Sequence, residues 1–467
     1  MRLRVLPVLL SSLLTAVAFA GDMAPPPPDE HPVFGEIAEA MDPAQLQSTL
    51  STLVGFGTRS TLSDTKSDKR GIGAARRWVQ SRFKQISKDC GGCLEVITPS
   101  QVFTGERTPK DGVDVMDIVA IQRGATDPDR YLVMTGHLDS RVRDVMDAKS
   151  DAPGADDDGS GVAAVLETAR VLSKYKFAAS IVYSVDSGEE QGLYGGKVIA
   201  QYAHNHQWQV EADLNNDIVG NSHGQNGVTD NTTVRVFSEG TRALETPKEA
   251  NERRYHGGEV DSPSRNVARY ALQAERYIPN WHVMMVYRTD RYGRGGDQVA
   301  FNELGYPAVR FTESHEDFTH QHQDVRVEGG IHYGDVLSGV DFPYLAKVAA
   351  TNAIALAGMA WAPAPPSGVS IASDPAPGLS GGTDTVFDWK PSAGAAGYRL
   401  HWRATIDPRW NAGHYVGPVQ HYLLKDVSID DWFFGVAAVS QDGFESPVVF
   451  PGAAGAFTPD QSGTGKP

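Results

Sequence analysis

Apolar positions follow two different periods along the chain, and each period predicts a type of element. Apolar residues recur at helical spacing over residues 35–56 and 71–88, which predicts two amphipathic helices near the beginning. Further along, short apolar runs such as 131–134 and 181–185 alternate with helical patterns such as 161–172. Strands that alternate with helices predict an α/β fold, and we expect a mixed, largely parallel sheet flanked by helices.

The composition changes near residue 362. Residues 35–361 carry the alternating pattern, and the stretch WAPAPPSGVS predicts an interdomain linker over residues 362–368. Residues 369–455 contain strand-like runs such as VFDWKP and WFFGVAAVS between Gly, Pro and Asp turns. This spacing predicts a small C-terminal β-sandwich, followed by a flexible tail over residues 456–467.

The first twenty residues have the layout of a signal peptide. Two arginines precede a short apolar stretch, and Ala18-Phe19-Ala20 supplies a small-residue cleavage site. A retained membrane anchor is the alternative, but the apolar stretch is short for a bilayer span of about 20 residues. We therefore expect a soluble protein that is secreted or periplasmic and has no membrane partner, with an extended, loosely held Pro-rich leader over residues 21–34.

Charge and cysteine content narrow the possible partners. Lys and Arg total 42 against 58 Asp and Glu, a formal charge of −16, which argues against nucleic acid as a partner and allows a site that collects cations. The chain contains two cysteines, Cys90 and Cys93. Two thiols are too few for a structural zinc site, and both a small disulfide and a free pair remain open.

Acidic residues and histidines gather where the predicted strands of the first domain end. These residues are His137 and Asp139; Asp156, Asp157 and Asp158; Glu189 and Glu190; Asp217; and Glu313, His315, His320, His322 and Asp324. In open α/β sheets, ligands bind outside the carboxyl ends of the strands. So much negative charge in one crevice repels itself unless cations lie there, and imidazole with carboxylate is a ligand set suited to zinc.

The residue types also suggest separate roles. Three carboxylates and two histidines suit two metal ions that share one bridging carboxylate and activate a water molecule. Glu189 and Glu190 are neighbours on a chain that we expect to be extended, so one side chain binds metal while the other serves as general base. Asp139 lies two residues after His137, on the same face of an extended chain, where its carboxylate can fix the imidazole tautomer.

Five motifs together resemble a known family. GHLDS, APGADDDGSGVAAVLE, GEEQGLYGG, NNDIVG and a late His-x-x-x-Asp are similar to motifs of the secreted bacterial zinc aminopeptidases. These enzymes belong to the aminopeptidase and glutamate carboxypeptidase family of co-catalytic zinc exopeptidases. The resemblance covers residues 40–360, and the motifs are weak singly but specific in this order. It implies a zinc exopeptidase fold, two zinc ions per chain, and peptide or protein amino termini as substrates.

The resemblance also implies the role of each site residue. The implied assignments are His137 and Asp217 on one zinc, Glu190 and His320 on the other, Asp157 as the bridge, Glu189 as general base, and Asp139 orienting His137. Spacing alone does not choose Asp157 over its neighbours, and the family pattern further implies a cis peptide bond after it. His320 is chosen because Asp324 follows four residues later, and His322 is the alternative.

Two features of the sequence bear on which substrate the site would bind. The ligand carboxylates together with Glu189 and Asp139 could carry five negative charges against four positive charges from the metals. This slightly negative cleft suits a peptide ammonium group. The loop YRTDRYGRGGD, however, supplies three arginines. An arginine that reached the cleft could bind a substrate carboxylate, which would favour carboxypeptidase action.

Gln298 stands where relatives often have His. We expect it to affect the surroundings of the metals rather than to bind them.

The C-terminal strand pattern resembles a fibronectin type III domain. The cues are FDWKP, YRLHWR and FFGVAAVSQDGFESP, and the resemblance implies a spacer or a module that contacts a surface or a polysaccharide, without a catalytic role. The expected function is therefore that of an exported dinuclear zinc aminopeptidase. A carboxypeptidase, a glutaminyl cyclase-like enzyme with one working zinc, and a non-enzymatic binding ectodomain are the alternatives.

Overall fold

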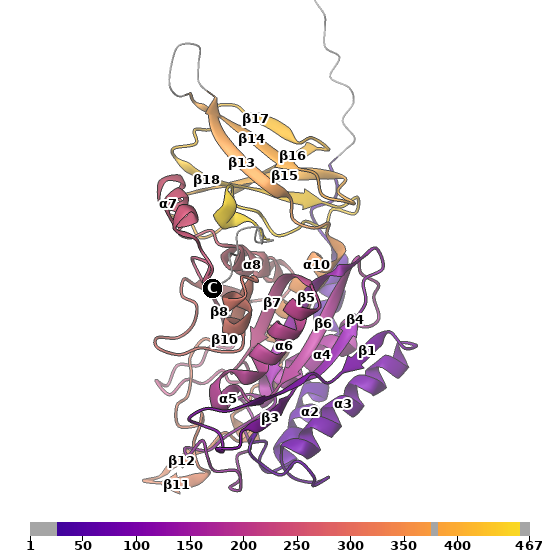
Figure 1. The fold of residues 1–467 in the computed structure, drawn as a ribbon, viewed down its shortest axis with the longest axis vertical. Helices are drawn as coiled ribbons and strands as arrows, with labels where there is room; N and C mark the ends of the chain where they lie inside the picture. The colour runs from indigo at the N-terminus through magenta and orange to yellow at the C-terminus, as the bar shows by residue number, and fades with distance from the viewer. Residues whose placement is uncertain (1–25, 375–381, 458–467) are drawn as a thin grey trace, which may run out of the picture.

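A mixed sheet forms the centre of the first domain in the computed structural model, which describes residues 26–374 and 382–457 (Figure 1). The expected signal peptide lies outside the described residues. Within them the central sheet has eight strands. In spatial order these are β1 (Leu94–Ile97), β4 (Ile118–Gln122), β6 (Ala179–Asp186), β5 (Asp127–His137), β7 (Gln209–Asn216), β10 (Ala308–Glu313), β8 (Thr233–Ser238) and β9 (His282–Val286).

The middle of this sheet is parallel. Strands β6, β5, β7 and β10 run in one direction, whereas β4 and β8 pair with this group in antiparallel fashion. The carboxyl ends of the four parallel strands therefore lie along one edge, which is where open α/β sheets bind ligands. The predicted α/β class is confirmed.

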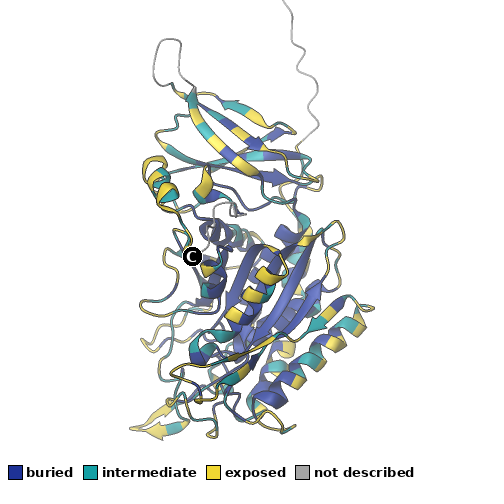
Figure 2. Ribbon diagram, viewed as in Figure 1, coloured by how far each residue is buried: buried dark blue, intermediate teal, exposed yellow. Residues whose placement is uncertain are grey.

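Helices cover both faces of the sheet. On β5, Leu132 and Met134 belong to the core that includes α4 (Gly159–Leu172) and α10 (Phe342–Trp361). Tyr131 and Val133 belong to a second core, with α6 (Tyr194–Asn205) and α9 (Gln298–Glu303). Adjacent residues of a strand point to opposite faces, so an apolar run on β5 serves both layers. Figure 2 shows these central strands as buried.

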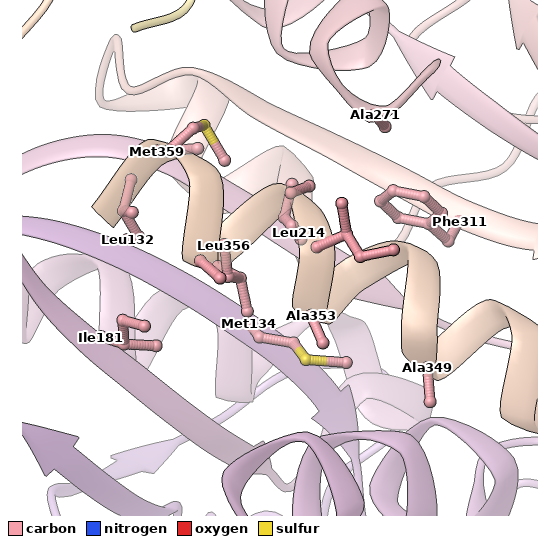
Figure 3. Packing of buried hydrophobic residues seen from close by; sticks show 14 of the residues in the cluster. Leu132, Met134, Ile181, Leu214, Ala271, Phe311, Ala349, Ala353, Leu356 and Met359 are labelled. Atoms are coloured by element: carbon pink, nitrogen blue, oxygen red, sulfur yellow. The ribbon is translucent and has the colours of Figure 1, made fainter. Parts of the chain in front are cut away.

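Helix α10 packs along the sheet through small and medium-sized side chains (Figure 3). Its Ala349 and Ala353 let the helix approach closely, and Leu356 and Met359 fill the space above Leu132 and neighbouring strands. Nearly all of α10 is buried. In the described ranges, no helix combines the length and apolar character needed to cross a membrane.

The beginning of the chain differs from the prediction of one helix over 35–56. The structure has two helices, α1 (Pro32–Glu39) and α2 (Pro43–Gly55). Pro43 has no N–H group to continue a helix, and the Asp42 side chain accepts from the backbone N–H of Ala44, so a new helix begins there. Helix α3 (Ile72–Asp89) confirms the second predicted helix, and a Cys90–Cys93 disulfide follows it.

Shorter elements surround the main sheet. They are the hairpin β2 (Ser100–Phe103) and β3 (Val113–Met116), helices α5 (Glu189–Gly192), α7 (Pro247–His256) and α8 (Pro263–Ala271), the hairpin β11 (Arg326–Glu328) and β12 (Ile331–Tyr333), and the 3₁₀ turns η1 (Leu272–Arg276), η2 (Leu337–Gly339) and η3 (Ala453–Gly455). Helix α5 and the β11–β12 hairpin lie toward the end of the molecule opposite the C-terminal sheets (Figure 1).

Two antiparallel sheets form the C-terminal part. One contains β13 (Ser367–Asp374), β14 (Asp384–Lys390) and β17 (His421–Leu424). The other contains β16 (Ala412–Gly417), β15 (Gly397–Ala404) and β18 (Trp432–Val439). Phe387 of the first sheet meets Phe434 of the second edge-to-face, with ring centroids 5.3 Å apart, so the sheets pack as the expected small β-sandwich. The resemblance to fibronectin type III stays a prediction.

The C-terminal sheets are joined to the first domain by buried polar contacts. The carboxylate of Asp261 accepts from Arg269 of α8 and, at 2.7 Å, from Arg403 of β15, and all three side chains are buried. Near the start of β5, Arg130 donates to the carbonyl of Ala362 at 2.6 Å, directly after α10. The Asp261 contacts hold β15 against α8, and the Arg130 contact holds the end of α10 near the start of β5.

The described part of the leader is held more firmly than expected. His31 stacks on Phe444 of the C-terminal part, with ring centroids 4.2 Å apart, and its backbone N–H donates to the Tyr277 hydroxyl. Asp29 forms an ion pair with Arg399 of β15. Residues 29–31 therefore bridge both parts of the molecule, and the expectation of a loose leader is wrong for them.

Candidate metal centre

The first group of metal-ligating residues brings together three separate segments. His137 ends β5, Asp157 lies in the loop before α4, and Asp217 follows β7 directly. The Nε2 atom of His137 lies 3.3 Å from Asp157 Oδ1 and 3.8 Å from Asp217 Oδ1. All three side chains are buried, and their ligand atoms lie close enough together to hold one ion.

The second group shares one residue with the first. The Nε2 atom of His322 lies 2.9 Å from Asp157 Oδ2 and 3.0 Å from Glu190 Oε1. Asp157 therefore presents Oδ1 to one group and Oδ2 to the other. This is the arrangement that a carboxylate bridging two metal ions requires.

Several ligand atoms of the two groups are buried without a hydrogen-bond partner, and this shows whether a metal ion suits the site. His137 Nε2, Asp157 Oδ2 and Glu190 Oε1 are all buried and lack a hydrogen-bond partner of normal geometry. Buried polar atoms almost always have a partner, so three such ligand atoms in one place are suited to binding a cation. Two imidazoles and three carboxylates are the donors that zinc takes in such centres, so the residues present fit zinc.

The structure brings His322, and not His320, into the centre. The chain turns over residues 317–321, where the backbone N–H of His320 donates to the carbonyl of Asp317. This turn keeps the imidazole near Asp317, with Nε2 3.7 Å from its carboxylate and outside both groups. The family spacing that favoured His320 is therefore corrected to His322, the alternative.

Asp139 supports the centre in a different way from the one expected. The Nδ1 atom of His137 donates to the backbone carbonyl of Asp139 at 3.0 Å, whereas the carboxylate oxygen is 3.5 Å away. This bond leaves Nε2 free to bind metal. The Asp139 carboxylate instead accepts hydrogen bonds from the backbone N–H groups of Glu189 and Glu190, with N···O distances of 3.3 and 3.2 Å. The main chain of Asp139 thus orients the histidine, and its side chain anchors the glutamate pair.

Glu189 and Glu190 begin a short helix and are not extended. Gly188, with φ of 75°, turns the chain out of β6, and α5 starts at Glu189. Glu190 points into the second metal group, and Glu189 lines the cavity of about 420 Å³ above the centre. In the metal-free protein, burial raises the pKa of Glu189 to about 8 against the influence of His137, and the neighbouring Glu190 adds to the rise.

The three aspartates at 156–158 have different roles, because their carboxylates contact different groups. Asp158 caps α4 and accepts from the backbone N–H of His137 at 2.9 Å, and Asp156 accepts from the N–H of Gly220 at 2.7 Å. Of the three, Asp157 alone belongs to the candidate metal groups. The peptide bond between Asp157 and Asp158 is cis, as the resemblance implied.

Two arginines contact the ligands and were missed in the sequence. Nη1 of Arg310, on β10, lies 2.9 Å from Asp217 Oδ2. Nε of Arg141 lies 2.7 Å from Glu190 Oε2, and its Nη2 lies 2.6 Å from His322 Nδ1. An arginine inside the apolar run YPAVRFT and one directly after GHLDS were the signals that could have found them.

Neighbouring histidines and Arg310 keep two of the ligand carboxylates charged. Burial alone would raise the pKa of Asp157, but His322 and His137 hold it well below its usual range in the metal-free protein. Burial also opposes ionisation of Asp217, and Arg310 together with His137 lowers its pKa to about 2. Both aspartates are therefore deprotonated at neutral pH, as metal binding requires.

Gln298 is buried at the start of α9. Its Nε2 atom donates to Asp290 Oδ2 at 2.8 Å, and Asp290 in turn contacts Arg310 at 3.3 Å. The buried Gln298 thus belongs to the chain of contacts that ends on Asp217.

Similarity to known proteins agrees with this geometry. Residues 117–328 match peptidase family M28. A "Probable zinc metalloprotease" of Pyrenophora tritici-repentis is 41% identical over 434 residues, which span 92% of this chain and 88% of that protein. The chain belongs to peptidase family M28. A "Probable zinc metalloprotease" of Pyricularia oryzae is 42% identical over 91% of this M28 chain and 85% of its own length.

Solved structures confirm the fold of this M28 peptidase chain. The LapA aminopeptidase of Legionella pneumophila has a TM-score of 0.50 at 18% identity, over 72% of this chain and 76% of that protein. LapB of the same organism gives the same score and identity over 71% and 76%. The sequence relatives named above are fungal, and the bacterial origin expected from the motifs is untested.

Proposed function

We propose that the protein is an exported dinuclear zinc aminopeptidase. The single observation that carries the proposal is the sharing of Asp157 between two groups of ligand atoms, with His137 Nε2 and Glu190 Oε1 left without hydrogen bonds. The M28 relatives are named zinc metalloproteases, and LapA is named an aminopeptidase, which supports the same reading.

Each ligand would have a defined place in the loaded enzyme. His137 and Asp217 would hold one zinc, Glu190 and His322 the other, and Asp157 would bridge both. Zinc in such a centre acts as a Lewis acid on the scissile carbonyl and lowers the pKa of water to near neutral. Arg310 and Arg141 contact the outer oxygens of Asp217 and Glu190, which fixes the orientation of both ligands.

Glu189 would move the proton. It stands outside both metal groups yet lines the same cavity, so its carboxylate is free to act on substrate and water. It would accept a proton from water as the water attacks the peptide carbonyl, and then donate that proton to the leaving amine. A carboxylate placed beside the reacting atoms can serve first as general base and then as general acid.

Export is part of the proposal and rests on two independent features. The first twenty residues have the pattern of a signal peptide, and the Cys90–Cys93 disulfide suits an oxidising compartment. Sequencing the amino terminus of the protein recovered outside the cell tests this directly. A mature chain that starts after Ala20 supports export, and an intact Met1 in a cell-bound protein contradicts it.

Metal content and activity measured together test the catalytic proposal. Purified protein should contain two zinc ions per chain, hydrolyse aminoacyl-p-nitroanilides, lose this activity on chelation and regain it with zinc. Acyl-blocked peptides should not be cleaved, because the free amino terminus would be part of recognition. Cleavage of blocked peptides from the carboxyl end indicates a carboxypeptidase, and glutamine cyclisation with one zinc indicates a cyclase. Full activity without metal refutes the proposal.

A further inference from the structure

The cavity above the metal centre is lined by four arginines, and three of them have no role in the proposed mechanism. Arg107 comes from the loop between β2 and β3, Arg141 follows β5, and Arg291 and Arg294 come from the loop between β9 and α9. Three separate loops thus each present guanidinium groups to a space of about 420 Å³. Such convergence sets the charge of the cavity.

Two of the four arginines are neutralised within the protein. Arg141 contacts Glu190 as described, and Arg291 pairs with Asp290 at 3.2 Å and Glu316 at 3.1 Å. Their charges are offset by buried carboxylates. They form part of the cavity wall and are not available to a ligand without breaking these pairs.

Arg107 and Arg294 are differently placed. Arg107 is exposed, and among the described residues it has no carboxylate within ion-pair distance; its Nη1 donates to the backbone carbonyl of Glu190 at 3.1 Å. Nη1 of Arg294 lies 3.7 Å from a Glu316 oxygen that already accepts from Arg291 at 3.1 Å. Both guanidinium groups therefore retain N–H donors and positive charge for a ligand in the cavity.

The rest of the lining is unsuited to an apolar substrate side chain. Among the described residues of the wall, Leu193 is the one apolar side chain, and the others are charged residues, His322 and glycines. Pockets that select apolar groups are lined mainly by apolar and aromatic side chains. Selection by hydrophobic contact is therefore weak here.

Charge counting corrects the expectation of a slightly negative cleft. The lining contains four carboxylates, those of Asp157, Glu189, Glu190 and Asp217. Against them stand three guanidinium groups, because the charge of Arg291 is already offset outside the lining, so the lining has a net charge of −1 without metal. Two zinc ions would then leave the cavity net positive. A net positive, water-accessible cavity attracts anions.

We infer that this site selects peptides that carry a carboxylate close to the scissile bond, held by Arg107 and Arg294. The inference rests on the proposed peptidase function and adds its substrate class. Guanidinium groups bind carboxylates through paired, charge-assisted hydrogen bonds, which give both affinity and orientation. The carboxylate can be the side chain of an amino-terminal Asp or Glu, or the free carboxyl terminus of a short peptide.

Two pairs of matched substrates can be used to measure the preference for a carboxylate on the zinc-loaded enzyme. One pair tests an acidic side chain, and the other tests a free carboxyl terminus. Glutamyl-p-nitroanilide against glutaminyl-p-nitroanilide compares side chains without a free carboxyl terminus. Alanyl-alanine against alanyl-alanine amide compares carboxyl termini without an acidic side chain. In at least one pair the acid should exceed the amide in kcat/KM by ~10-fold or more, as expected for hydrogen bonds to a charged group. Ratios near one in both pairs overturn the inference.

Paired variants test whether the named arginines carry the preference. Arg294→Gln and Arg107→Gln should each reduce the acid-to-amide ratio while leaving turnover of the amide substrate and the zinc content largely unchanged. Arg288→Gln and Lys110→Gln are the controls, because these exposed cations lie in the same two loops but outside the cavity lining. An unchanged ratio in both cavity variants, or an equal loss in the controls, overturns the assignment.

Binding measurements keep this inference separate from the proposed function. Calorimetry with glutarate against its monoamide reports carboxylate recognition without turnover, and the affinity difference should shrink in Arg294→Gln and Arg107→Gln. If no peptide is hydrolysed yet glutarate binds through these arginines, the peptidase proposal fails and carboxylate recognition stands. If neutral peptides are hydrolysed as well as acidic ones, the peptidase stands and the inference fails.

Discussion

Arg310 and Asp217 form a buried ion pair in which the two carboxylate oxygens of the aspartate face different partners. Nη1 of Arg310 lies 2.9 Å from Oδ2, whereas Oδ1 belongs to the group of atoms that faces His137. The Arg310 side chain is fully buried, and Asp217 is 3% exposed. Without metal, Arg310 is therefore the main cation that compensates Asp217, and with metal the aspartate is shared between two cations.

Replacing Arg310 by Met should destabilise the metal-free protein strongly. Removing one partner of a buried ion pair leaves an uncompensated charge and costs ~3–5 kcal/mol of unfolding free energy. Zinc should stabilise the variant more than it stabilises the wild type, because it restores a cation beside Asp217. Urea unfolding of both proteins with and without zinc measures this difference. A zinc-induced gain no larger than that of the wild type contradicts the role given to Arg310.

The two histidines two residues apart should behave differently. His322→Ala removes a ligand atom that lies 3.0 Å from Glu190, so the variant should hold one zinc ion tightly and lose most activity. His320→Ala changes a side chain outside both groups and should keep both zinc ions. Metal analysis after gel filtration distinguishes the variants. Loss of zinc from the His320 variant alone would restore the assignment drawn from the family spacing.

Substitutions of the two neighbouring glutamates should also have different effects on zinc content and turnover. Glu190→Ala should weaken binding of one zinc ion, because Glu190 supplies an oxygen to the second group. Glu189→Gln preserves size but cannot accept a proton, so turnover should fall by ~10²–10⁴-fold while both zinc ions and substrate still bind. Zinc content and steady-state kinetics should be measured side by side. Zinc loss from the Glu189 variant with retention in the other would exchange the two roles.

The buried contact between the domains should matter for stability and not for chemistry. Arg403→Met leaves Asp261 with Arg269 alone in a buried position, and we expect a loss of ~3 kcal/mol of unfolding free energy. Arg409→Met, on the same side of the C-terminal part, breaks a more exposed pair with Glu275 and should cost ~1 kcal/mol or less. Thermal unfolding and hydrolysis of a small substrate test both. Loss of zinc from folded Arg403→Met would show that the C-terminal sheets support the metal centre.

Much of the fold was predictable because the pattern is local. The apolar run 181–185 and the helical spacing over 161–172 appear as β6 and α4, and the motifs between strands converge because parallel strands end at one edge. The break between α1 and α2 was missed, although Pro43 and the capping Asp42 were visible in the sequence. Regular periodicity on both sides outweighed these two residues in the prediction.

The finer geometry of the centre was less predictable, since it depends on how loops turn. The turn after Asp317 decides that His322 and not His320 reaches Asp157, and sequence spacing carries no information on that turn. The role of Asp139 changed for a similar reason, because a backbone carbonyl reaches His137 before the carboxylate does. The charge of the cavity depends on arginines from loops far apart in the chain, which no single motif joins.

Strand β5 sets the distance between the two ends of the molecule. Arg130, near its start, contacts Ala362 beside the C-terminal sheets, and His137, its last residue, lies in the metal centre. Six residues of extended chain lie between them, so the two ends are ~23 Å apart. The end of β5 that carries His137, near α5, thus lies away from the C-terminal sheets (Figure 1). A molecule immobilised through those sheets, on a resin or on a natural surface, would keep its entrance turned toward dissolved peptides.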